Sequence, residues 1–127
     1  MFRESNFNKP IGDWNVSRVK NMSWMFQYSN FNQDISRWNV SEVENMRGMF
    51  EENEKFNQDL NSWNVSKVID MSSMFENTQF NGNISRWNVS SVKYMDKMFY
   101  KDSFFNQDLS RWNVSSVENM ENMFCFA

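Results

Sequence analysis

Three short oxygen-rich segments are the part of this sequence whose residue types come closest to a chemical site. Each reads Asn-Gln-Asp, and they lie at residues 32–34, 57–59 and 106–108. Amide and carboxylate oxygens gathered in turns can bind calcium in repeat proteins. Loops of that kind rely on glycines, which these segments lack, and the first copy holds Lys9 and Pro10 at the corresponding place. The sequence therefore predicts no metal site.

Catalytic groups are scarce. The 127 residues include no His, which removes the usual general base and the commonest metal ligand. The single Cys, Cys125, excludes an internal disulfide, and neither a Ser/His/Asp set nor a Cys/His pair can form. The only glycines are Gly12, Gly48 and Gly82, so no glycine-rich phosphate loop is present. We predict a protein that is not an enzyme and needs no cofactor.

One repeat organises the whole chain. Five tryptophans mark it, at Trp14, Trp38, Trp63, Trp87 and Trp112, and the intervals between them alternate between two lengths that differ by a single residue. A period of this length is typical of a repeat array in which each copy is one supersecondary unit. We expect one array over residues 1–127, with copies at approximately 3–26, 27–50, 51–75, 76–99 and 100–124, and we expect it to be a piece of a longer array.

The second copy shows how one repeat is expected to fold. Trp38 and Val40 flank Asn39 with the alternation of a short strand. From Val43 the apolar spacing becomes three, three and one through Phe50, which predicts one face of a short helix. Ser41, with Glu44 three residues later, reads as the helix N-cap, and Ser115 with Glu118 repeats this capping box. We therefore predict an α/β fold: a right-handed leucine-rich-repeat-like solenoid of five coils, each a short parallel strand plus a short helix.

Stacking such coils would place equivalent side chains in columns. The Trp column could serve as a stacking platform for bases or sugars, and the Met pairs as a soft binding face, but both are in register with inward Val and are predicted to be core. Trp24 is the one tryptophan outside this column and is not assigned to the core, because it lies between Met22 and Met25 at a position that varies among the copies. A second column, expected to form turn hydrogen bonds inside each coil, consists of Asn8, Asn32, Asn57, Asn81 and Asn106.

The candidate contact stripe combines the Asn that follows each repeat Trp with three Arg that precede it. The Asn side chains either stiffen the sheet or offer amides to a polar ligand. The Arg either form a solvated edge or clamp an acidic partner. The members of the stripe are Asn15, Asn39, Asn64, Asn88, Asn113, Arg37, Arg86 and Arg111.

Charge excludes two classes of partner. The net charge is −3 with both signs interspersed, whereas nucleic-acid binding calls for a basic stripe and membrane association for a polybasic cluster. No apolar run is long enough to span a bilayer. The apolar ends of the array would allow end-to-end self-association.

The phrase Trp-Asn-Val-Ser-x-Val-x-x-Met-x-x-Met-Phe, followed after the link by Phe-Asn, resembles two related repeat types. One is the BspA-like class of leucine-rich repeats. The closer is a repeat of matching length and unknown function, found in mycoplasma-type and other microbial surface proteins. The resemblance covers all five copies. It implies a leucine-rich-repeat-like solenoid without known catalysis, and a cell-surface or extracellular location.

Together these features predict a non-enzymatic module for recognition of a protein, or for adhesion. Two alternatives stay open. One is a structural spacer or stalk without a ligand, and the other is a glycan-binding module that uses Trp24, Tyr28 or other exposed aromatic residues.

Overall fold

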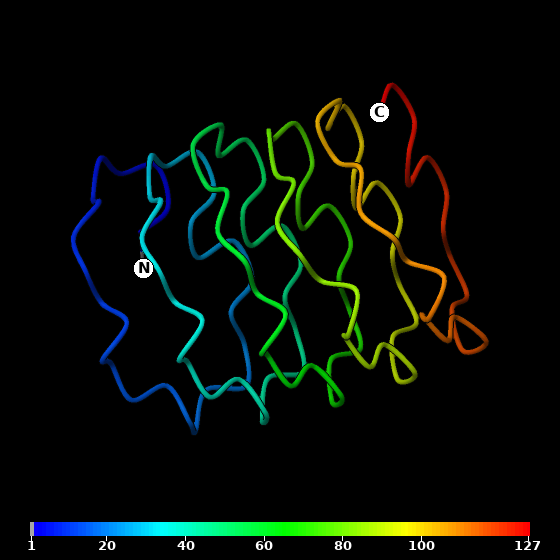
Figure 1. The fold of residues 1–127 in the computed structure, drawn as a ribbon, viewed down its shortest axis with the longest axis horizontal. Helices are drawn as coiled ribbons and strands as arrows, with labels where there is room; N and C mark the ends of the chain where they lie inside the picture. The colour runs from blue at the N-terminus through cyan, green and yellow to red at the C-terminus, as the bar shows by residue number, and fades with distance from the viewer. Residues whose placement is uncertain (1) are drawn as a thin grey trace.

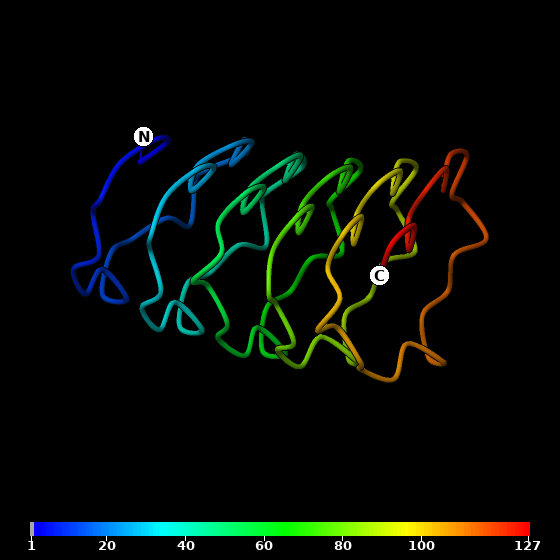
Figure 2. The same ribbon diagram turned by 90° about the horizontal axis from the view of Figure 1, so that it is seen from above.

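The structure, a computed structural model that describes residues 2–127, is a row of stacked coils. The chain advances by one coil per sequence repeat, from the N-terminal coil at one end of the row to the C-terminal coil at the other (Figure 1). Seen from above, successive coils follow similar paths (Figure 2). Side chains that are one repeat apart in the sequence are therefore neighbours in space.

The predicted α/β architecture is wrong. Residues 2–127 contain no α-helix, and their β-structure is limited to isolated parallel bridges between adjacent coils. These bridges join Asn21 to Asn45, Asn45 to Asp70, Asp70 to Tyr94 and Tyr94 to Asn119. The remaining backbone consists of turns and irregular segments. The chain is thus not a leucine-rich-repeat solenoid of strands and helices. No described residue belongs to a helix that could cross a membrane.

Two backbone positions in every coil explain why no helix forms. In the second coil Gly48 and Glu52 both have φ of 59°. An α-helix needs negative φ at each residue, so these left-handed residues interrupt it within one turn. The same two positions are left-handed throughout the array, at Trp24, Ser73, Lys97 and Asn122 and at Glu4, Tyr28, Asn77, Lys101 and Phe126.

The backbone of this segment pairs between coils instead. The Met46 amide donates to the Asp70 carbonyl at 2.9 Å, the Gly48 amide to Ser72 at 2.8 Å, and the Phe50 amide to Met74 at 2.9 Å. Within the coil the Met49 amide reaches only back to Met46, as in a β-turn. Each coil is thereby joined to the next by a ladder of parallel hydrogen bonds. We call this segment, residues 46–52 in the second coil, the ladder segment.

The predicted helix caps are also wrong. The Glu44 amide donates to the Lys20 carbonyl of the preceding coil at 2.8 Å, so no helix begins after Ser41. The equivalent Glu118 amide donates to Lys93 at 2.8 Å. Two of the apolar steps of three residues, from Val40 to Val43 and from Met46 to Met49, are β-turns, whereas the step from Val43 to Met46 passes through the parallel bridge at Asn45.

The predicted strand is correct in side-chain alternation but not in pairing. Trp38 and Val40 are buried, whereas Asn39 is exposed. The backbone of residues 38–40 makes no hydrogen bond to another coil among the described residues; the Trp38 amide instead donates to Ile35 within a β-turn at 3.1 Å. The parallel pairing therefore lies further along the coil than predicted.

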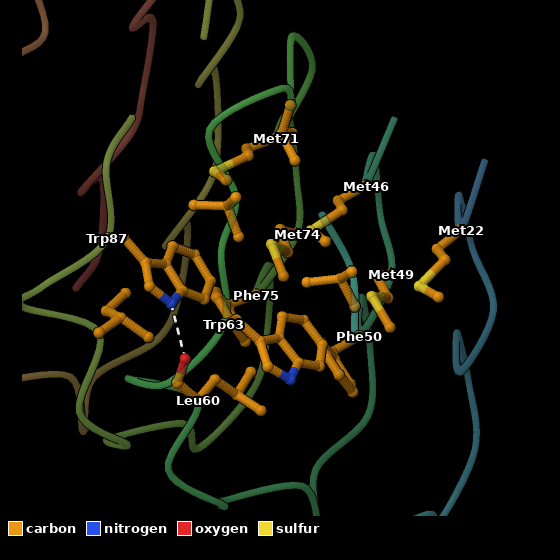
Figure 3. Packing of buried hydrophobic residues seen from close by; sticks show 14 of the residues in the cluster. Met22, Met46, Met49, Phe50, Leu60, Trp63, Met71, Met74, Phe75 and Trp87 are labelled. Carbon is orange, nitrogen blue, oxygen red and sulfur yellow. Dashed lines mark hydrogen bonds between the residues drawn. The ribbon is translucent and has the colours of Figure 1, made fainter. Parts of the chain in front are cut away.

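The interior confirms the predicted core columns in the middle coils. Met46, Met49, Met71 and Met74 have no exposed surface, and they stack beside Phe50 and Phe75 (Figure 3). Phe50 lies 5.6 Å from Phe75 in the next coil and 4.0 Å from Phe56 in its own link, measured between ring centroids. Two parallel columns of stacked rings thus run through the array.

Each buried repeat tryptophan is also tied to the preceding coil. The indole Nε1–H donates to a backbone carbonyl there. Trp63 donates to Ile35 at 3.0 Å. Figure 3 shows the equivalent bond from Trp87 to Leu60, at 2.8 Å. Trp38 and Trp112 do the same to Ile11 and Ile84. Trp14, in the first coil, is 44% exposed, and the predicted core role fails for it alone among the five.

The length of the link that follows each ladder segment depends on one polar side chain, three residues after the ladder Phe, the residue that Phe50 represents in the second coil. This polar column is buried in all but the first coil. Its members are Ser5, Ser29, Asn53, Thr78 and Asp102. In short links a hydroxyl accepts the amide two residues on, as Ser29 does from Phe31 at 3.3 Å. In long links Asn53 accepts from both Lys55 and Phe56 at 3.0 Å, which accommodates the extra residue. The alternation between shorter and longer repeats therefore follows from the identity of this side chain.

The tryptophan hydrogen bond predicts that a Trp→Phe substitution lowers the free energy of unfolding by an amount that depends on the coil. Trp63→Phe would remove one of the two donors to the Ile35 carbonyl, which keeps the Trp38 amide, and would open a small void, lowering the free energy of unfolding by about 1–3 kcal/mol. Trp14→Phe is the matched control. Because Trp14 is half-exposed and its indole donates no hydrogen bond to the described residues, the loss should stay below about 1 kcal/mol. Urea unfolding followed by circular dichroism measures both. Equal losses would contradict the proposed tie between coils.

Candidate functional site

The contact stripe lies at a corner of the coil. Residues 35–38 form a β-turn that places Arg37 at its tip, and a second turn, residues 40–43, closes with a 3.0 Å bond from the Val43 amide to the Val40 carbonyl. Asn39 lies between the two turns. All five Asn and all three Arg of the stripe are exposed, so the structure presents every predicted member to solvent.

The stripe Asn side chains have one fixed end and one free end. The Asn39 Oδ1 accepts the Ser41 amide at 3.1 Å, forming an Asx-turn that fixes the side chain. Asn15, Asn64, Asn88 and Asn113 make the equivalent bond. Among the described residues they make no hydrogen bond to one another, and each bonds to its own backbone instead. The NδH2 donors make no hydrogen bond to the described residues and point away from the fixed oxygen.

The stripe Arg side chains are held only weakly. Arg37 lies 3.8 Å from Asp13, and both side chains are more than four-fifths exposed, so this ion pair contributes little. Nearby, hydrogen bonds from the Ser36 side chain and amide hold the pKa of Asp34 below its usual value. Asp108 is stabilised in the same way by Ser110. The corner thus carries weakly held cations beside fixed, ionised carboxylates.

The second Asn column bonds between coils rather than inside them. The Asn32 Oδ1 accepts the Asn57 amide of the next coil at 3.0 Å, and Gln58 Nε2 donates to the same oxygen at 2.9 Å. Bonds of this kind run from Asn8 to Asn106. The prediction of a structural role is confirmed, but the bonds cross the coil boundary.

The oxygen-rich segments are occupied by these same contacts. The Oδ1 atoms of Asn32 and Asn57 accept from the next coil, and Asp34 and Asp108 cap their own turns. Among the described residues, no three His, Cys, Asp or Glu side chains gather where a metal ion could bind.

The buried polar column contains one group that sequence reasoning did not single out. Asp102 has no exposed surface, and burial raises its pKa to about 6. Its Oδ1 accepts the Phe104 amide at 3.1 Å, and its Oδ2 lies 3.2 Å from the Thr78 hydroxyl. The constant offset of three residues from the ladder Phe is the signal that could have revealed this column.

These observations define a class: a repeat protein whose turn-rich coils are joined by parallel backbone hydrogen bonds. A family model for the Mycoplasma protein of unknown function, DUF285, matches residues 1–79 and 66–127. Because the matches cover the whole chain, the chain belongs to this family. They show no link to the BspA-like leucine-rich repeats. Searches of curated proteins and of solved structures gave no match.

Asp102 predicts an unusual dependence of stability on pH. Because its pKa is raised in the folded state, folding binds a proton between about pH 4 and 6, and stability falls as the pH rises through that window. Asp102→Asn copies Asn53, which holds the same position in the other long link, and removes the buried charge. We expect it to stabilise the protein by about 1–3 kcal/mol at pH 7 and by little at pH 4.

Asp108→Asn provides a control of opposite sign. The pKa of Asp108 is lowered in the folded state, so its ionised form contributes stability above about pH 4 that is lost as the pH falls. This variant should lower the thermal midpoint at pH 7 and leave it unchanged in strong acid. Thermal melts of both variants at several pH values make the test. An Asp102→Asn effect that does not vary with pH would contradict the assignment.

Proposed function

We propose that this chain is a non-enzymatic recognition module that binds a partner protein through the contact stripe, at a cell surface. The observation that carries the proposal is the repeated corner: in every coil an exposed Asn is fixed by its own oxygen and offers a free amide donor. Preorganised donors lose little entropy on binding. The surface location is supported by the resemblance of the repeat to those of microbial surface proteins.

The chemistry of the stripe favours an acidic, carbonyl-rich partner surface. Its free groups are amide and guanidinium donors, which match carboxylate and backbone carbonyl oxygens. A row of such donors, one per coil, suits an extended segment better than a small molecule. Exposed residues on a rigid array decide what the array binds, since its core is committed to stacking.

The experiment compares two double variants with equal charge change. Proteins captured by the immobilised chain are identified, and each is then measured by surface plasmon resonance. Arg37→Glu with Arg86→Glu should weaken binding about tenfold or more, because charge reversal repels an acidic partner. Lys55→Glu with Lys101→Glu, two exposed changes at or shortly after the end of a ladder segment, should leave binding unchanged. Thermal midpoints of both should stay close to that of the parent.

Three results would contradict the proposal. Equal binding by both double variants would remove the stripe from the interaction. Absence of any partner, with full tolerance of the Arg substitutions, would favour a spacer. Signal on a sugar array that is lost on Trp24→Ala would favour glycan binding instead.

A further inference from the structure

A trough on the ladder segments is a second candidate site, separate from the contact stripe. It has a volume of about 400 Å³ and runs across several coils. One of its sides is the first left-handed column, where Trp24 and Lys97 enclose the much smaller Gly48 and Ser73. The hollow opens at Ser73, whose side chain is short, whereas the space over Gly48 is covered by the Trp24 indole.

The end of the trough is closed by an aromatic ring. A Cβ added to Gly48 would lie 2.5 Å from Cδ1 of Trp24, so the indole lies directly over the Gly48 backbone. Gly48 is therefore required by this contact, whereas its left-handed φ is shared by the side-chain-bearing residues at the same position in the other coils. Trp24 is itself left-handed and remains 39% exposed, although a strained conformation and an exposed indole both cost stability.

A second wall of the trough, formed by Gln27 and Glu51, has more hydrogen-bond acceptors than donors to satisfy them. Gln27, which is 5% exposed, donates through Nε2 to the Glu51 carboxylate at 2.9 Å. Its Oε1 is buried and has no hydrogen-bond partner. Such an atom is rare in folded proteins and costs stability. It is the one buried side-chain polar atom among the described residues that is left in this state.

The carboxylates of this wall lack counter-ions. Within residues 2–127 neither Glu51 nor Glu76 has a cation within ion-pair distance. Burial, and then the charge of Glu76, raise the pKa of Glu51. Two carboxylates thus face the same hollow, and the Gln27 hydrogen bond and the nearby Arg47 charge offset the charge of Glu51 only in part.

Each of the three cations at the rim of the trough lies near another group, although the two arginine ion pairs are long. Arg47 lies 3.8 Å from Asp70, and Arg3 lies 3.9 Å from Glu4. The Lys97 ammonium lies over the Tyr100 ring at 5.6 Å from its centroid. The groups of the trough that remain available to a ligand are an aromatic face, two carboxylates and an amide oxygen.

We propose that the trough binds a lysine or arginine side chain of a partner protein. The cation would lie against the Trp24 ring and donate hydrogen bonds to Glu51 and Glu76. Because Gln27 Oε1 is buried, the bound cation would donate to it only after the side chains that line the trough shift around the ligand. An anion is disfavoured by the acceptor-rich wall, and a metal ion by the lack of a third acidic ligand among the described residues. This site does not depend on the contact stripe.

The test uses Nα-acetyl-lysinamide as the probe and the neutral Nα,Nε-diacetyl-lysinamide as its control. Both are titrated into the full ¹⁵N-labelled chain while the Trp24 indole N–H resonance is followed. The charged probe should give a saturable shift with a dissociation constant on the order of millimolar, and the neutral probe none. Glu51→Gln should weaken binding about tenfold, whereas Glu54→Gln, on an exposed link, should not.

Ser73→Lys gives an independent arm that does not rely on a soluble probe. Lys97 holds the equivalent position in the next coil with nearly the same left-handed φ, so the substitution fits the backbone. The tethered ammonium should fill the trough, abolish the probe shift and lower the pKa of Glu51, measured by carboxyl ¹³C titration. Equal shifts with both probes, or an unchanged Glu51 pKa in Ser73→Lys, would overturn the proposal.

Discussion

The hydrogen-bond ladder between ladder segments is the interaction on which the rest of this structure depends. A coil with no helix and no extended strand cannot satisfy its own amides, so its neighbours must. Alternate amides from Met46 to Glu52 donate to the next coil, and the two left-handed residues orient them to do so. The stacked rings, the buried methionines and the tryptophan bonds all require the register that this ladder sets. Stability is therefore a property of adjacent coils rather than of any single one.

Sequence reasoning recovered the repeat, its period and most of the core because side-chain columns depend only on register. The inward positions of Trp38, Val40 and Met46 follow from stacking, whatever the backbone does between them. The backbone itself was predicted wrongly, because a spacing of three and four residues fits a helix and a series of β-turns equally well. What separates the two is a left-handed φ, and residues such as Trp24 and Lys97 give no sign of it.

The two candidate binding surfaces also differ in how far the sequence predicts them. The exposure of the contact stripe could be predicted from alternation around each Trp, but its Asx-turns could not, since they depend on the turn that replaces the helix. The trough was invisible in the sequence. It needs Gly48 and Ser73 to lie next to each other across a coil boundary, with Gln27 buried beside them. The column of Trp24, Gly48, Ser73 and Lys97 varies from coil to coil, and this variation makes the trough different from the rest of the ladder surface.

The measurement that tests the central claim most directly is detection of scalar coupling across hydrogen bonds by long-range HNCO spectroscopy. The ladder predicts a correlation from the Phe50 amide to the Met74 carbonyl in the next coil, which lie 2.9 Å apart, with equivalents in the other coils. A correlation from the Phe50 amide to the Met46 carbonyl, the bond of an α-helix, would contradict the account and restore the helix that the sequence pattern predicts.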